Sequence, residues 1–237
     1  MKAILKREIR AYFTSPVGYV CIAALAALYG FAYFAFVYSS SSTSNIRGVY
    51  NFVFSFAMMI IPIITMRSMS EDRKNKTDQA LLTAPVGVGG IVMGKFLSAY
   101  LVYFVATTLG LLPAFAIYPS VSGPMPWGIL FGNYISALLY GGAMTAIGVF
   151  ISSLTESQVV AAVSTFITSI LLMYVDSISY AVSNKVLTTV VGWISFNNRN
   201  SPFLQGLLDV PAIVFFLSVM AIFIFLAAKR LESRRWN

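Results

Sequence analysis

Six long apolar stretches, separated by short polar segments, dominate the pattern of hydrophobic and polar positions along the chain. They cover residues 17–38, 49–66, 96–117, 127–151, 159–175 and 210–228, and none of them contains a charged residue. A bilayer core about 30 Å thick is crossed by about 20 apolar residues of α-helix. Because lipid offers no hydrogen-bond partners, each stretch must satisfy its own backbone as a helix. The pattern therefore predicts an all-α membrane protein whose six transmembrane helices form one domain, residues 1–237.

The first 14 residues precede the first apolar stretch and have an amphipathic pattern. Ile4, Ile9 and Tyr12 fall near one face of a helix, and the basic residues fall mostly on the other face. Helices with this pattern lie in the plane of the membrane interface. We therefore expect residues 1–14 to form an N-terminal interfacial helix.

Two of the polar segments predict further short elements. Residues 70–83 contain Asp72–Lys76 and a second charge pair at i,i+4 spacing, and each such pair favours a helix by about 0.2–0.5 kcal/mol. Residues 182–205 include an apolar run that is too short to span a bilayer. We expect a cytoplasmic helix over residues 70–83, and a short outer re-entrant helical segment over residues 182–205, before the last span.

The basic residues are concentrated on one side of the predicted membrane. Thirteen of the 16 flank the spans on the side of both termini: Lys2, Lys6, Arg7, Arg10, Arg67, Arg73, Lys74, Lys76, Lys95, Lys229, Arg230, Arg234 and Arg235. Positive residues resist translocation, so both termini are predicted to be cytoplasmic. The net charge of +8 lies beside the spans, so it indicates orientation in membrane lipid and not nucleic-acid binding.

The chain offers few residues for catalysis. It has no histidine and a single cysteine, Cys21, so an intrachain disulfide and a His/Cys metal site are excluded. Residues 89–96 nearly fit the phosphate-binding loop G-x-x-x-x-G-K-[ST], but Phe96 has no hydroxyl for Mg²⁺ and the following residues enter the bilayer. We therefore expect no catalytic, cofactor-binding or metal-binding residues, and we do not expect an enzyme.

The segment between the second and third apolar stretches resembles the signature of type-2 ABC transporter permeases. It reads Arg67…Glu71-Asp72-Arg73…Thr77-Asp78…Leu81-Leu82-Thr83-Ala84-Pro85, followed by Gly94-Lys95 at the next span. Two further runs, FLQGLLD at 203–209 and LESRRW at 231–236, resemble the gliding-motility-type branch of that family. Lys76 and Asp78 depart from the family pattern, which has glycine and glutamate there. Lys76 is expected to stiffen the segment, because glycine costs a helix about 1 kcal/mol.

The resemblance implies that residues 70–83 form a coupling helix that contacts a separate ABC ATPase subunit, which binds ATP and Mg²⁺ itself. The residues carried over as the contact surface are Arg67, Glu71, Asp72, Arg73, Thr77, Asp78, Leu81 and Leu82. Glu156, in the inner turn between the fourth and fifth spans, is a second expected contact. A second permease, identical or homologous, is expected to pair with this chain. The implied function is the permease subunit of an ATP-driven exporter in the bacterial plasma membrane.

Three other functions fit the sequence to different degrees. A non-transporting membrane scaffold of an ATPase-driven machine remains open, because the same coupling could drive mechanical work. An ion-coupled secondary transporter is disfavoured, because ion relays place charged side chains inside the membrane and the six stretches carry none. A membrane-embedded enzyme is disfavoured because general acid–base catalysis needs positioned titratable groups. The uncharged, aromatic-rich spans mildly favour an amphipathic or hydrophobic cargo.

Overall fold

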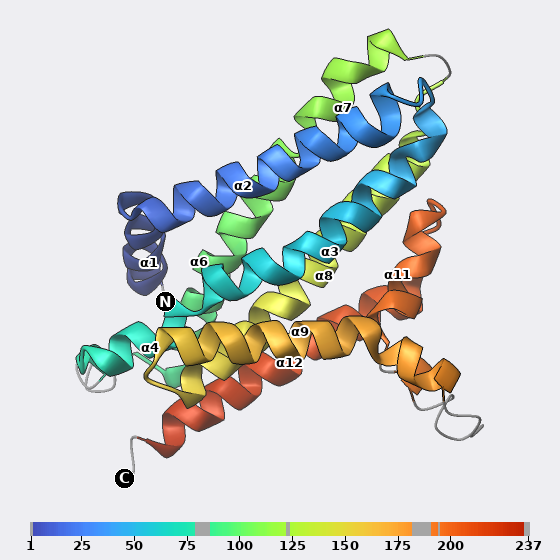
Figure 1. The fold of residues 1–237 in the computed structure, drawn as a ribbon. Coiled ribbons are helices and arrows are strands. Elements are labelled where there is room, and N and C mark those ends of the chain that lie inside the picture. The colour runs from blue at the N-terminus through green and yellow to red at the C-terminus, as the bar shows by residue number, and fades with distance from the viewer. Residues whose placement is uncertain (1, 79–85, 122–123, 182–190, 194, 235–237) are drawn as a thin grey trace.

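The computed structural model describes residues 2–78, 86–121, 124–181, 191–193 and 195–234, and most of these residues are helical (Figure 1). The helices of the first half are α1 (Lys2–Thr14), α2 (Pro16–Tyr33), the π-helical turn η1 (Phe34–Tyr38), η2 (Thr43–Asn45), α3 (Ile46–Thr65), α4 (Arg67–Lys74) and α6 (Val88–Leu109). Those of the second half are α7 (Leu112–Ile117), η3 (Tyr118–Ser120), α8 (Trp127–Leu154), α9 (Gln158–Ala181), α11 (Phe196–Leu204) and α12 (Val210–Ser233).

Six helical runs are long and apolar enough to cross a membrane, which confirms the six predicted spans. They are Pro16–Tyr38, Ile46–Lys74, Val88–Ser120, Trp127–Leu154, Gln158–Val175 and Val210–Ser233. The third run begins earlier than the sequence predicts. The apolar stretch starts at residue 96, after Lys95, whereas α6 begins at Val88, so Lys95 lies inside the helix.

Helix α8 occupies the centre of the bundle, where it packs against α3, α6, α9, α11 and α12. In the most apolar 18-residue stretch of α8, 67% is buried, against 17% in the corresponding stretches of α9 and α12, so these two helices present most of their surface outward. The small residues of α8 serve packing within the chain. A Cβ at Gly142 would lie 2.6 Å from the terminal methyl of Met220 on α12, so the small residue leaves room for the methionine side chain between the two helices.

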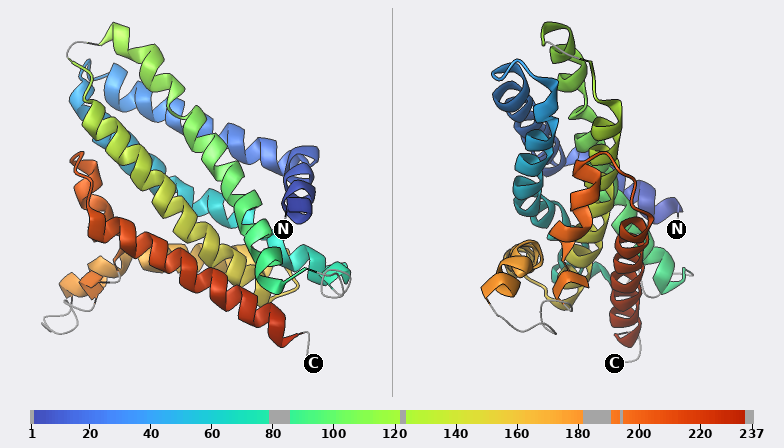
Figure 2. Two further views of the ribbon diagram at one scale, coloured as in Figure 1. Left: turned by 180° about the vertical axis from the view of Figure 1, so that it is seen from behind. Right: turned by 90° about the vertical axis from the view of Figure 1, so that its right-hand side faces the viewer.

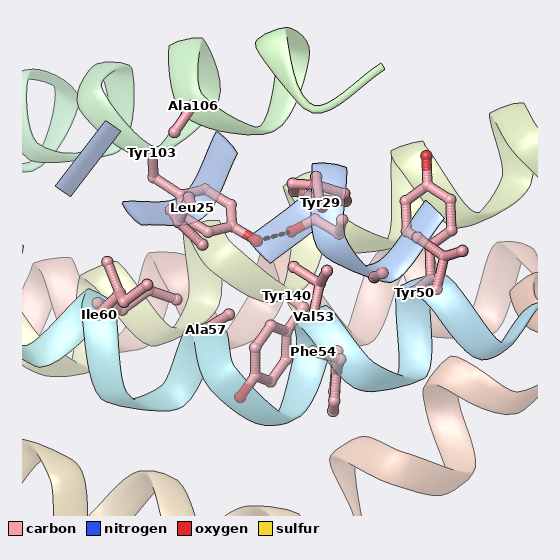
Figure 3. Packing of buried hydrophobic residues seen from close by; sticks show 14 of the residues in the cluster. Leu25, Tyr29, Tyr50, Val53, Phe54, Ala57, Ile60, Tyr103, Ala106 and Tyr140 are labelled. Carbon is pink, nitrogen blue, oxygen red and sulfur yellow. Dashed lines mark hydrogen bonds between the residues drawn. The ribbon is translucent and has the colours of Figure 1, made fainter. Parts of the chain in front are cut away.

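The core between α2, α3, α6 and α8 is rich in aromatic side chains (Figure 3). The rings of Phe54 and Tyr140 lie 3.9 Å apart between centroids, and those of Tyr29 and Tyr50 lie 5.8 Å apart in an edge-on arrangement. The hydroxyl of Tyr103 donates to the carbonyl of Ala137 at 3.0 Å. Neutral packing of this kind holds the spans to one another.

Helix α1 confirms the expected N-terminal helix, and it turns away from α2 at Ser15, whose hydroxyl accepts from the Val17 amide. Its apolar face is used for packing, since Ile4 and Tyr12 are buried and the helix lies against α6 and α2. Its location in the membrane interface stays a prediction.

The expected outer segment, 182–205, is only partly described, because residues 182–190 and 194 fall outside the described residues. Its last part is α11, which packs on α8 and α9 with Phe196 and Phe203 buried. Re-entry of this segment into the membrane stays a prediction.

The two ends of the bundle carry different elements. Both termini, α1 and α4 lie at one end, and α7 and α11 lie at the other (Figures 1 and 2). We call the first the basic end, and the charge bias of the sequence predicts that it is cytoplasmic.

Candidate functional site

The candidate site is the α4 segment, residues 67–78, which follows α3 almost without interruption and projects at the basic end (Figure 1). Helix α4 ends at Lys74, and Lys76 has a φ of 56°, in the left-handed region. The structure thus differs from the expected single helix over residues 70–83, because the chain turns at Asn75 and Lys76. The expectation that Lys76 stiffens the segment is wrong. Glycine, which the family pattern has at this position, adopts this conformation without the steric cost that a lysine bears.

The first turn of α4 is fixed by a side chain from another helix. The Ser152 hydroxyl, near the end of α8, accepts hydrogen bonds from the amides of Met69 and Ser70, both at 3.0 Å. The same hydroxyl donates to the carbonyl of Met66 at 3.0 Å. Because the backbone groups at a helix junction need partners, this contact anchors the base of α4 to α8.

A second contact joins α4 to the turn between α8 and α9. The Arg73 guanidinium lies 3.0 Å from the Glu156 carboxylate and donates to the Ser153 carbonyl at 3.2 Å. Only 11% of the Arg73 side chain is exposed, whereas 67% of the Glu156 side chain is exposed. The structure therefore brings Glu156 next to the α4 segment, as an exposed partner of Arg73.

Arg67 connects the start of α4 to the corner between α1 and α2. Its guanidinium pairs with Glu71 at 2.9 Å, donates to the Ser15 hydroxyl at 2.8 Å and lies 5.5 Å from the centre of the Tyr12 ring. Tyr12 in turn donates its hydroxyl to the carbonyl of Ile64 at 2.7 Å. These contacts hold the α1–α2 corner against the junction of α3 and α4.

The most buried charge of the site is Lys95, whose side chain is 2% exposed. Its ammonium lies 2.5 Å from the Asp72 carboxylate and 3.2 Å from the Glu8 carboxylate, and it donates to the Ser68 carbonyl at 2.5 Å. Arg7 adds a second cation, 2.5 Å from Glu8 and 3.4 Å from Asp72. Burial alone would lower the pKa of the Arg7 guanidinium, but the two carboxylates raise it above its ordinary value, so this cation stays charged.

These four residues, Arg7, Glu8, Asp72 and Lys95, form what we call the charge cluster. The apolar pattern of the sequence places Lys95 outside the span and indicates no role for Glu8. One signal was available, because Glu8 is the only acidic residue before Glu71. Residues 89–96, which nearly fit the phosphate-loop pattern, lie in the first turns of α6, and Lys95 pairs with two carboxylates.

The predicted contact residues divide into two groups. Arg67, Asp72, Arg73 and Asp78 are mostly buried and lie close to charged groups of the chain itself; Asp78 lies 3.8 Å from Arg234 on α12. Glu71 is half-exposed, and Thr77 is exposed and donates to Asp72 at 2.7 Å. Leu81 and Leu82 lie outside the described residues. The exposed tip of the segment, residues 74–77, consists of Lys74, Asn75, Lys76 and Thr77.

A comparison with protein-family models identifies the chain. The model described as an ABC-2 family transporter protein matches residues 2–229, which include every described helix from α1 to α11 and most of α12. The chain belongs to the ABC-2 transporter family. No curated protein matches it. This ABC-2 protein is thus a multi-pass membrane protein, and its family supports a permease component of an ABC transporter. Among the described residues, no cluster of His, Cys, Asp or Glu could hold a metal ion.

Proposed function

We propose that this ABC-2 permease is the membrane subunit of an ATP-driven exporter, and that a separate ATPase subunit drives it through the α4 segment. The observation that carries the proposal is the contrast within that segment. Its tip, residues 74–77, is exposed, whereas its base is fixed to α8 by Ser152 and to α6 by Lys95. A displacement applied to the tip is therefore passed to the spans instead of being absorbed by a loose loop.

The contact surface that we propose for the ATPase extends from this tip. It comprises Lys74, Lys76 and Thr77, with Glu71 and Glu156 at its border and Leu81 and Leu82 beyond it. Arg67, Asp72, Arg73 and Asp78, which the family resemblance also assigns to the contact, support the tip from inside in this proposal. ATP and Mg²⁺ bind to the ATPase and not to this chain.

The complete transporter in this proposal contains two permeases, identical or homologous, in a bacterial plasma membrane. The basic end faces the cytoplasm, where the ATPase binds. The two runs FLQGLLD and LESRRW support placement in the gliding-motility-type branch of the family. The cargo is amphipathic or hydrophobic, since the spans contain many aromatic residues. A scaffold that uses the same coupling for mechanical work is the second candidate.

Site-directed cross-linking tests the proposed contact. In a Cys21→Ala background, Lys76→Cys places a single cysteine at the tip, and Lys6→Cys places one on the exposed face of α1 as the matched control. The chain is purified in mild detergent together with the ATPase that accompanies it, and a short bifunctional thiol-to-amine reagent is added. We expect a cross-link to the ATPase from position 76 and not from position 6. An ATPase that co-purifies but cross-links only from position 6 would exclude the α4 segment as its docking site.

A further inference from the structure

Helix α1 packs closely against α6 at Gly94. A Cβ at this position would lie 3.2 Å from a methyl of Ile4 and 3.5 Å from the amide nitrogen of Leu5. Such a contact is tighter than side chains normally make, so even a Cβ at this position would have to displace Ile4, and a larger side chain would displace it further. Gly89, in the first turn of the same helix, shows the contrast, because a Cβ there would meet nothing within 4 Å.

This crossing places Glu8, one turn after Ile4, within reach of Lys95, the neighbour of Gly94. A lysine ammonium has three donors and no acceptor. Here three acceptors surround it, one from α1 (Glu8) and two from α4 (Asp72 and the Ser68 carbonyl). Lys95 thus reaches from α6 into the space between α1 and α4, two elements that are separated by 52 residues in the sequence.

We call the contact of Lys95 with Glu8 of α1 and with Asp72 and Ser68 of α4 the joint. Because its charged groups are largely buried, the joint has a defined geometry. A buried ion that loses its partner is strongly destabilising, because its desolvation is no longer compensated. If α1 separated from α4, Lys95 would lose either Glu8 or the pair Asp72 and Ser68. Arg7 opposes the same separation, because it projects from α1 and lies 3.4 Å from Asp72. Arrangements in which α1 and α4 move apart are therefore disfavoured.

We propose that Gly94 and Lys95 join α1 to the α4 segment, so that the two elements move as one unit, and that Lys95 is a positioning residue for the tip. The part of this proposal that concerns coupling rests on the function proposed above. The part that concerns geometry does not, and it is tested on the chain alone.

The geometric test measures the distance between α1 and α4. Nitroxide labels are attached at Lys6→Cys and Lys74→Cys, both exposed, in the Cys21→Ala background, and the distance distribution is recorded by pulsed electron paramagnetic resonance in detergent. We expect a single narrow distribution for the otherwise unchanged chain. Gly94→Leu, which forces α1 away from α6, should broaden it and shift it to longer distance. Gly89→Leu adds the same side chain to the same helix in open space and should leave the distribution unchanged.

Charge removal tests Lys95 itself. Lys95→Met leaves two carboxylates without their buried cation and should lower the yield of folded protein several-fold. The triple variant E8Q/D72N/K95M removes three of the four charges of the cluster and leaves only the half-exposed Arg7. It should restore the yield while leaving the distance distribution broad. A broad distribution in a well-folded triple variant supports a positioning role. A wild-type distribution in either the triple variant or Gly94→Leu would overturn the proposal.

The reconstituted complex supplies the functional readout. The triple variant should lose at least about half of the stimulation that the permease gives to its ATPase, while the activity of the isolated ATPase stays unchanged. Full stimulation would show that Lys95 does not position the tip. If the tip fails to cross-link to the ATPase but the distances behave as expected, the joint between α1 and α4 stands and the proposed function fails.

Discussion

The aromatic core and the basic end of this ABC-2 permease are held together by different interactions. In the core, Phe54, Tyr140 and their neighbours make neutral contacts (Figure 3). At the basic end, Lys95, Asp72 and Ser152 hold α4 through ion pairs and hydrogen bonds of defined length and direction. Apolar packing gives stability in proportion to buried area, whereas polar joints fix relative positions. We therefore expect core changes to alter stability and basic-end changes to alter coupling.

The largest expected effect comes from the core. Phe216→Ala removes a fully buried ring of α12 that packs against Phe196 and Phe215, and should lower the free energy of unfolding by about 3–5 kcal/mol. Phe225→Ala, on the same helix, removes a ring that is 60% exposed and serves as the control. Thermal unfolding in one detergent compares the two variants. Equal losses in both would mean that the outward face of α12 is packed as tightly as its inner face.

Removing the Ser152 hydroxyl should have the next largest effect. Ser152→Ala leaves two buried amides of α4 without their acceptor, and buried unsatisfied groups cost about 1–3 kcal/mol. Ser153→Ala is the matched control, because that hydroxyl donates only to the Phe150 carbonyl within its own helix. Hydrogen exchange at residues 67–74 should increase in the first variant and not in the second. Unchanged protection in Ser152→Ala would show that α4 is anchored by other contacts.

The tip should show the opposite behaviour from the core. Lys74→Glu with Lys76→Glu reverses two exposed charges and should change stability by less than about 0.5 kcal/mol. It should weaken ATPase binding by about tenfold, which corresponds to about 1.4 kcal/mol. Lys6→Glu with Arg10→Glu makes the same change of charge on α1 as a control. Affinity is measured by titrating the purified ATPase into the reconstituted permease, and equal weakening by both pairs would point to a general charge effect.

Reversing the charges of Glu71 and Asp72, which the family resemblance assigns to the ATPase contact, would be a poorer test of docking. Asp72 lies 2.5 Å from the buried Lys95, so reversing its charge would place two cations together and damage the fold. The loss of coupling in such a variant would then not report on docking.

The spans were predictable from the sequence because a bilayer imposes a length and an apolar composition on each of them. The charge bias also predicts an even number of spans with both termini on one side, and both termini lie at the same end of the bundle (Figure 2). Each of these inferences uses only local composition.

The polar joints were not predictable, because their partners are far apart in the chain. Lys95 and Glu8 are separated by 87 residues, and Ser152 and Met69 by 83. No periodicity links such positions. The charge of Lys95 predicts a position outside the membrane-spanning helix, whereas the three acceptors around it make its burial possible. The role of Gly94 depends on the crossing of two helices, which a single sequence does not show.

Lys76 gives the smallest expected effect, and its sign is informative. Lys76→Gly places a residue without a Cβ at a φ of 56° and should remove up to about 1 kcal/mol of backbone strain, partly offset by the greater entropy of the unfolded chain. Lys74→Gly, in the last helical position of α4, should instead destabilise by about 0.5–1 kcal/mol. Thermal unfolding of the two variants in parallel separates these effects, because both remove one exposed lysine. Equal destabilisation would mean that residue 76 is helical in solution and that the segment continues as one helix beyond Lys74. A stabilising Lys76→Gly would instead indicate that residue 76 has the left-handed conformation in solution, which glycine adopts at no steric cost.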